Sequence, residues 1–117
     1  MNPKKSDVIL EVGCGPGVWT KLVADKCKKI TAIDISEGML KQAKRFSNRK
    51  NVKFILGDSS FITNQKFDKI FAVRSFEYIN DKAATFEKFG SLLGTNGKLV
   101  IITKSKPCLW DFIYTEG

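Results

Sequence analysis

Residues 10–17 read LEVGCGPG, and this stretch decides the fold because an apolar run leads directly into glycines at alternate positions, Gly13, Gly15 and Gly17. Residues 8–12, VILEV, are rich in β-branched side chains, which is typical of a strand buried on both faces of a parallel sheet. A glycine costs roughly 0.5–1 kcal/mol relative to alanine inside a regular element. A turn without a ligand needs only one or two glycines. The backbone is therefore expected either to bend through positive φ or to be approached closely by a ligand.

Strand and helix patterns alternate along the rest of the chain, with Ser36 and Asp81 as predicted helix N-caps. A loop or short helix replaces the third crossover, and Gly94 ends the last helix before a turn at Asn96-Gly97. The predicted strands cover residues 8–12, 30–35, 52–56, 67–73 and 98–103, and the first helix covers residues 18–27. This order predicts an α/β fold with a doubly wound parallel sheet, in one domain over residues 1–117.

The composition excludes several kinds of chemistry. The sequence has no histidine, which removes imidazole bases, Ser-His nucleophiles and histidine metal sites. Its cysteines (Cys14, Cys27 and Cys108) form no CxxC pair, so neither a metal site nor a redox dithiol is expected. The N-terminus carries no apolar signal region, and no apolar run reaches the ~18 residues of a membrane span. The sequence predicts a cytoplasmic protein without a membrane span. The net charge of +8 is equally consistent with solubility alone and with an acidic partner.

Two acidic residues follow predicted strands and narrow the choice of ligand. A phosphate-binding P-loop needs a lysine where Val18 stands, and a dinucleotide fingerprint needs its third glycine one residue later than Gly17. Asp34, at the end of the second strand, could accept hydrogen bonds from both hydroxyls of a ribose. The alternative is a structural carboxylate at the start of the helix beside Ser36. Asp58, after the third strand, suits an exocyclic amine, or serves as an ordinary turn aspartate.

Together these motifs resemble the class I S-adenosylmethionine-dependent methyltransferases, a Rossmann-like superfamily. EVGCGPG is similar to the family's first motif, AIDIS to the segment with the ribose-binding acid, and GDSS to the segment with the adenine-binding acid. FDKIFAVRSFEYI is similar to the fourth-strand motif, and SLLGTNGKLVII to the turn and fifth strand. The resemblance runs from about residue 8 to residue 103 and implies the strand order 3-2-1-4-5, with S-adenosyl-L-methionine as cofactor.

The resemblance also implies roles for individual residues. The glycine backbone would lie against the methionine moiety and ribose, Glu11 would organise hydrogen bonds around the methionine ammonium, and Cys14 would fill the space between glycines. Asp34 and the adjacent Ile35 would meet the ribose, while Asp58 and Ser59 would meet the adenine. The expected cofactor-binding set is Glu11, Gly13, Cys14, Gly15, Gly17, Asp34, Ile35, Asp58, Ser59 and Arg74, and the substrate-side candidates are Ser75, Glu77 and Tyr78.

The chain departs from the family after the fifth predicted strand. Members continue with a helix and an antiparallel strand pair, and residues 104–117 are too few to supply them, so these final strands are expected to be missing. Residues 98–103 would then form an open apolar edge, and open edges recruit partners. The sequence predicts that this edge pairs with a second copy in a homodimer, or that residues 109–114 fold across it.

The methyl acceptor is less defined by the sequence. The end of the fourth strand, RSFEYI, resembles enzymes that methylate small molecules, lipids or sugars, and it lacks the signature of amino-group nucleic-acid methyltransferases. In-line methyl transfer needs a base only when the nucleophile must lose a proton, so the lack of histidine is tolerated. The alternatives are a cofactor-binding fragment or subunit without catalysis of its own, and an RNA methyltransferase. A nicotinamide dehydrogenase is disfavoured by Val18.

Overall fold

The structure, a computed structural model, describes residues 2–73, 81–102 and 107–111, the last as backbone. Its centre is a sheet in the order β3-β2-β1-β4-β5-β6, in which the first five strands are parallel and β6 is antiparallel to β5. The order 3-2-1-4-5 predicted from the resemblance is confirmed. The strands are β1 (Val8–Val12), β2 (Lys29–Asp34), β3 (Val52–Leu56), β4 (Phe67–Val73), β5 (Leu93–Ile102) and β6 (Pro107–Asp111).

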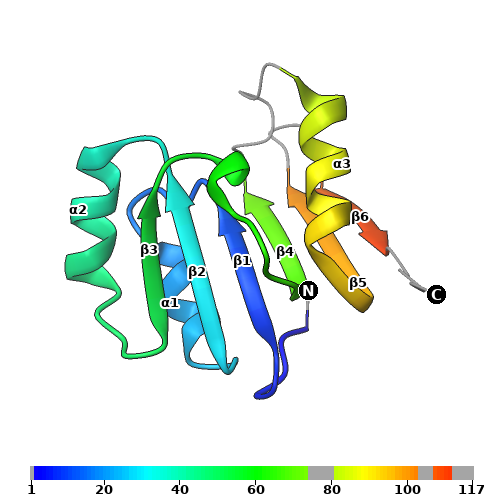
Figure 1. The fold of residues 1–117 in the computed structure, drawn as a ribbon. Coiled ribbons are helices and arrows are strands. Elements are labelled where there is room, and N and C mark those ends of the chain that lie inside the picture. Colours follow the sequence, from blue (N-terminus) through cyan, green and yellow to red (C-terminus); the bar gives the residue numbers. More distant parts are fainter. Residues whose placement is uncertain (1, 74–80, 103–106, 112–117) are drawn as a thin grey trace.

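Helices lie on both faces of the sheet, as Figure 1 shows. α1 (Val18–Ala24) and α2 (Glu37–Phe46) cover one face over β1, β2 and β3, while α3 (Lys82–Leu92) and the short 3-10 helix η1 (Ser59–Phe61) lie on the other. Both predicted N-caps are confirmed: Ser36 Oγ accepts from Met39 N at 3.3 Å, and Asp81 Oδ1 accepts from Ala84 N at 3.0 Å. η1 is the short helix expected in place of the third crossover.

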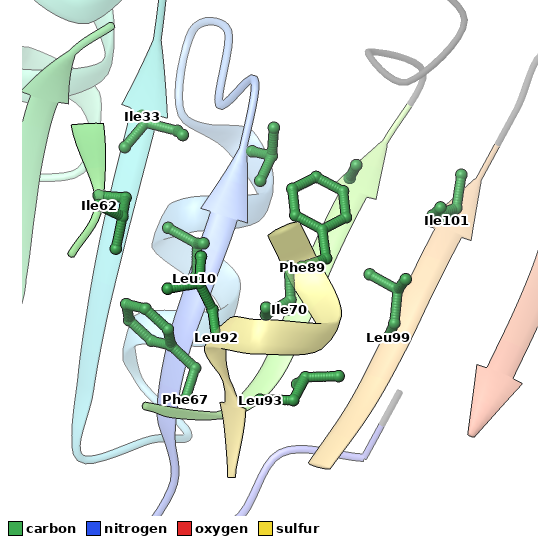
Figure 2. Packing of buried hydrophobic residues seen from close by; sticks show 12 residues of the cluster. Leu10, Ile33, Ile62, Phe67, Ile70, Phe89, Leu92, Leu93, Leu99 and Ile101 are labelled. Atoms are coloured by element: carbon green, nitrogen blue, oxygen red, sulfur yellow. The ribbon is translucent and has the colours of Figure 1, made fainter. Parts of the chain in front are cut away.

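Alternate residues of each central strand point to opposite faces and build two cores. Leu10 of β1 packs with Ile70 of β4, Leu99 of β5 and Phe89 of α3, as seen in Figure 2. Its neighbour Ile9 packs on the other face against α1. Glu11, two residues after Ile9, therefore belongs to the α1 side of the sheet. A carboxyl at that buried position is the first sign that this end of β1 has a task other than packing.

A buried ion pair lies at the amino end of the central strands. The ammonium of Lys69, from β4, contacts the carboxylate of Asp7, and both side chains are almost fully buried. Burial raises the pKa of Asp7, but the Lys69 ammonium and the backbone N–H of Lys4 outweigh it and hold that pKa below its usual value. The pair links β4 with the segment that precedes β1, and it lies far from the carboxyl ends of the strands.

Two expectations from the sequence need correction. The final antiparallel strands are not all missing, because β6 pairs with β5 from Lys98–Asp111 to Ile102–Pro107. The open edge expected to form a homodimer is therefore covered by the chain's own backbone, and the folding of the tail across it is confirmed for residues 109–111. The Asn96-Gly97 turn does not precede the fifth strand but lies within β5, where the register with β4 shifts and Asn96 has φ 62°.

The first helix is shorter than expected and only partly buried. It ends at Ala24 rather than Cys27, and the chain beyond it turns directly into β2. Val23 and Ala24 face the sheet, whereas Trp19 and Leu22 are 45% and 54% exposed. The apolar side chains of α1 therefore divide between the core and an uncovered surface.

Candidate functional site

The glycine loop joins β1 to α1 at the carboxyl end of the sheet, where open α/β sheets bind ligands. The amides of Gly13 and Cys14 donate to the Ile33 carbonyl of β2 at 2.8 and 3.0 Å, which holds the loop over the neighbouring strand. Gly13, Gly15 and Gly17 all have positive φ, at 74°, 54° and 91°. The first explanation for the alternating glycines, a backbone that bends through positive φ, is confirmed.

The surroundings of Gly15 and Gly17 differ. A Cβ added to Gly15 would meet nothing within 4 Å, so the backbone there borders open space. A Cβ added to Gly17 would lie 3.0 Å from Ala43 Cα and 3.1 Å from Ala43 Cβ of α2. Gly17 is therefore needed for the close packing of two helices, whereas Gly15 is the position where bare backbone is accessible to a ligand.

Asp34 ties the end of β2 to the glycine loop. Its Oδ2 accepts from Gly15 N at 2.8 Å, and its Oδ1 accepts from Ser36 N at 2.8 Å. The helix-entry role considered for this residue is thus present. Each carboxylate oxygen has two lone-pair directions and uses one of them in these bonds, so both retain capacity to accept from a ligand hydroxyl.

Glu11 is a buried carboxyl behind the loop. The side chain is 2% exposed, and its Oε1 accepts a hydrogen bond from the hydroxyl of Thr20 in α1. Burial raises the pKa of Glu11 to about 8; the Thr20 hydrogen bond opposes this rise, and the charge of Asp34 adds to it. A buried carboxyl whose pKa lies near neutral pH, at the carboxyl end of a central strand, is a candidate functional group.

Cys14 packs as a small core residue. Its side chain is 5% exposed and lies with Ala32, Leu40 and Ala43 beneath α2. Burial, with the nearby charges of Glu11 and Asp34, raises the pKa of the thiol to about 12. The thiolate needed for nucleophilic chemistry is therefore absent at neutral pH, which agrees with a filling role for this residue.

Asp58 caps η1 beside the end of β3. Its Oδ1 accepts from Ser60 N at 2.8 Å and from the Ser60 hydroxyl, and these two bonds hold the pKa of Asp58 below its usual value. The turn role considered for Asp58 is therefore present, while the exposed carboxylate retains room to accept another donor. Ser59 is buried, and it is Ser60 that contacts Asp58.

Exposed apolar side chains border these acids. Ile35 is 80% exposed and Phe61 is 68% exposed, which is unusual for large apolar residues. The Phe61 ring lies against Gly57, where an added Cβ would meet it at 2.6 Å, and Gly57 N donates to the Asp34 carbonyl at 2.9 Å. An apolar platform and the two acids thus occupy the same edge, an arrangement that suits a flat ring carrying polar groups.

The structure brings Glu11, the glycine loop, Asp34 and Asp58 together at one edge of the sheet, and it adds two residues that sequence reasoning missed. The sequence pattern around Thr20 does not indicate a role in the site, because its contact with Glu11 depends on how α1 packs on β1. Phe61 was detectable only as an aromatic residue after the predicted acidic turn. Arg74, Ser75, Glu77 and Tyr78 lie outside the described residues.

A separate apolar cavity of about 310 Å³ lies on the α1 side of β4 and β5. It is lined by Trp19 and Leu22 of α1 and by Phe71 and Val100 of the sheet, and no acid is among the described residues that line it. In Figure 1, α3 lies over the opposite face of β4 and β5, and on the α1 side no helix covers these two strands among the residues that the structure describes. The cavity therefore reflects an uncovered sheet face and is distinct from the candidate site.

Within residues 2–73, 81–102 and 107–111, the cysteine, aspartate and glutamate side chains do not gather in threes as a metal ion would require. None of the helices in the same ranges is long and apolar enough to cross a bilayer.

Comparison with known proteins agrees with this geometry. A family model described as a methyltransferase domain matches residues 9–97, which include β1, the glycine loop, both acids and α3. The chain belongs to the methyltransferase domain family. The matched range contains the glycine loop, Asp34 and Asp58, the residues on which the resemblance rested.

Relatives of this methyltransferase domain include enzymes with assigned acceptors. The chain is 39% identical over 98 residues to a malonyl-[acyl-carrier protein] O-methyltransferase of Acetivibrio thermocellus, covering 81% of this chain and 35% of that protein. It is 35% identical over 104 residues to malonyl-[acyl-carrier protein] O-methyltransferase 1 of Ilyobacter polytropus, covering 86% and 39%. The chain thus spans less than half the length of these curated relatives.

Solved structures share the fold. The N-methyltransferase NodS of Bradyrhizobium japonicum, in complex with S-adenosyl-L-homocysteine, superposes with a TM-score of 0.77 at 24% identity, covering 82% of this chain and 52% of that one. A DhpI-SAM-HEP complex gives a TM-score of 0.73 at 25% identity, covering 80% and 45%. The cofactor of these methyltransferases is S-adenosyl-L-methionine.

The described residues fit this cofactor. The open space over Gly15 admits a ligand against bare backbone, and Asp34 beside it keeps acceptor capacity for hydroxyls. Glu11 is a buried carboxyl with one hydroxyl partner and is suited to a cationic group. The exposed Ile35 and Phe61 offer apolar surface for a purine.

Proposed function

We propose that this chain binds S-adenosyl-L-methionine at the carboxyl edge of β1, β2 and β3 and is the cofactor-binding part of a methyltransferase that acts on a small or carrier-linked acid. The arrangement of the open Gly15 backbone between Glu11 and Asp34 carries the proposal. The curated relatives that act on a malonyl group support the acceptor class.

In the proposed site each described residue has a defined task. The Asp34 carboxylate, already held by Gly15 N and Ser36 N, accepts from ribose hydroxyls, and its fixed position costs no rearrangement on binding. Asp58 accepts from the adenine amine while Phe61 and Ile35 cover the ring. When bound, the cofactor supplies a methyl group activated by an adjacent sulfonium. The protein's part in the transfer is to hold the acceptor in line and to exclude water.

A carboxylate acceptor suits the residues of this chain. Carboxyl groups have ordinary pKa values near ~4, so a malonyl carboxylate is already deprotonated at neutral pH and needs no general base. The absence of histidine from the sequence therefore does not hinder O-methylation of an acid. The positive net charge of +8 favours the approach of an anionic acceptor. Ser75, Glu77 and Tyr78, after β4, are the proposed acceptor-side residues, and Arg74 stays a proposed cofactor-binding residue.

A second candidate function is cofactor binding without catalysis by this chain alone. The observation that favours it is coverage, because the chain spans 35% and 39% of the first two curated relatives. Acceptor-binding parts supplied by other segments or subunits would then be needed for turnover. RNA is a second acceptor class, supported only by the net charge of +8.

Calorimetric titration and a transfer assay test these functions. We expect S-adenosylhomocysteine to bind and radiolabelled methyl to pass from S-adenosylmethionine to a malonyl thioester, with the methyl ester identified by mass spectrometry. Binding without transfer to malonyl thioester, free dicarboxylic acids or RNA would establish the second function. Failure of S-adenosylmethionine and S-adenosylhomocysteine to bind would contradict the proposal.

A pair of variants links the binding to the site. Asp34→Asn keeps one acceptor oxygen but loses the charge, and we expect S-adenosylhomocysteine affinity to fall by about tenfold or more, as charged hydrogen bonds contribute ~1.5–3 kcal/mol. Asp68→Asn is the matched control, since Asp68 lies at the opposite end of the sheet and accepts from Val8 N at 2.7 Å. Equal affinity in both variants would remove Asp34 from the site.

A further inference from the structure

Glu11 occupies an unusual position for a carboxyl group. It lies in the middle strand of the sheet, with the apolar residues Ala32 of β2 and Phe71 of β4 opposite it. On the α1 side its partner is the neutral hydroxyl of Thr20. A carboxylate that is 2% exposed loses most of the contact with solvent that normally stabilises its charge.

The charged groups on the neighbouring elements do not supply that countercharge within the described part of the chain. Asp34, at the end of β2, is itself acidic and opposes ionisation of Glu11. On α1, the Lys21 ammonium lies 4.6 Å from the centre of the Phe46 ring. On β4, Lys69 is paired with Asp7.

The other groups that the structure describes on the loop and on β4 also bring no positive charge to Glu11. The Cys14 thiol of the loop has a pKa raised to about 12 and stays neutral, and Asp68 of β4 accepts from Val8 N at the far end of the strands. Arg74 lies outside the described residues. In the ligand-free protein the cluster of Glu11, Cys14 and Asp34 is therefore rich in acids and lacks a cation in the part of the site described here.

We propose that Glu11 is protonated in the ligand-free protein and releases this proton when the ammonium end of the adenosyl cofactor binds, so that Glu11 positions the cofactor through an ion pair made only on binding. The inference rests on the cofactor site proposed above. Binding thereby exchanges the proton of Glu11 for the ammonium group of the cofactor in the buried pocket.

The exchange balances in atoms and charge. The carboxyl O–H bond of Glu11 breaks and the proton passes to solvent buffer, while the cofactor ammonium keeps its own proton. The resulting carboxylate then accepts from the ammonium and from the Thr20 hydroxyl. With a pKa of about 8, Glu11 would carry about 0.9 proton at pH 7, so close to one proton is released per bound ligand.

Calorimetry in buffers of different ionisation enthalpy measures this proton directly. At pH 7 we expect S-adenosylhomocysteine, which has the ammonium, to release about 0.9 proton. Methylthioadenosine keeps the adenosine and the thioether but lacks the amino-acid end, and we expect it to release close to none. Binding of S-adenosylhomocysteine without proton release, or equal release with methylthioadenosine, would overturn the inference while leaving the cofactor site intact.

Two variants and one spectroscopic measurement complete the test. Glu11→Gln cannot ionise and should abolish proton release, with affinity lower by about tenfold. Glu37→Gln is the control, because Glu37 is exposed and paired with Lys41 at 3.7 Å, and it should leave the proton count unchanged. If Glu11→Gln does not fold, difference infrared spectroscopy of the unmodified protein decides, since a protonated-carboxyl band must disappear on binding. Persistence of that band would contradict the proposal, and failure of every adenosyl ligand to bind would instead reject the proposed function.

Discussion

The contrast between Gly15 and Gly17 gives the sharpest prediction. Both residues have positive φ, which costs a residue with a Cβ about 1–2 kcal/mol. At Gly17 the added Cβ also meets Ala43 at 3.0–3.1 Å, and overpacking of this kind adds about 1–3 kcal/mol. We therefore expect Gly17→Ala to lower the free energy of unfolding by roughly 2–5 kcal/mol, and Gly15→Ala by roughly 1–2 kcal/mol.

Ligand affinity should follow the opposite order. The Cβ of Gly15→Ala would project into the open space assigned to the cofactor, so we expect at least a tenfold loss of S-adenosylhomocysteine affinity. The Gly17→Ala protein, where folded, should bind within about threefold of the unmodified chain. These factors correspond to about 1.4 and 0.6 kcal/mol.

Urea unfolding and calorimetric titration of both variants measure the two quantities on the same samples. If Gly15→Ala binds as the unmodified chain does, the bare backbone at Gly15 is not the ligand surface. If both variants lose the same unfolding free energy, the close packing of Gly17 on α2 does not contribute to stability. Either result would refute the division of tasks between the two glycines.

Four further predictions follow from particular contacts. Lys69→Met leaves the Asp7 carboxylate buried without its cation, and we expect urea unfolding at pH 7 to show a loss of about 3–5 kcal/mol. Folding lowers the pKa of Asp7, so the stability that its carboxylate contributes is present above its unfolded pKa of about 3.8 and is lost as the pH falls through the folded pKa. The difference in unfolding free energy between the unmodified chain and Lys69→Met should therefore shrink in acid. Folding raises the pKa of Glu11 from 4.5 to about 8. The stability that neutral Glu11 contributes is therefore fully present below pH 4.5 and is lost as the pH rises through 8. Thermal unfolding curves of ligand-free Glu11→Gln should not show this loss of stability between pH 4.5 and 8. The Cys14 thiol should resist iodoacetamide at pH 8 in the folded protein, as peptide mass mapping would reveal, and rapid alkylation would show that the loop opens. Removal of residues 107–117 should uncover the β5 edge and cause concentration-dependent association in sedimentation experiments, and a strictly monomeric product would argue against β6 as an edge cover.

Much of the fold followed from local signals. The β-branched run at residues 8–12 and the Ser36 and Asp81 caps rest on backbone preferences and apolar periodicity, which act over a few residues. The strand order 3-2-1-4-5 was instead predicted from the resemblance to the methyltransferase family. The predicted ends of helices and strands were less accurate than the predicted order of these elements. The first helix stops at Ala24, and the Asn96-Gly97 turn became a bulge within β5, because pairing with β4 extends that strand back to Leu93.

The sequence by itself determined the glycine loop, its place after the first strand and the positions of two acids, Asp34 at the end of β2 and Asp58 after β3. The tertiary structure alone decided that Gly17 lies against Ala43, that Thr20 is the partner of Glu11 and that β6 covers the β5 edge. The physical reason is the range of the interactions. Backbone preferences are encoded by neighbouring residues, whereas the burial of a carboxyl, the close approach of two helices and the pairing of distant strands depend on how separated segments pack together.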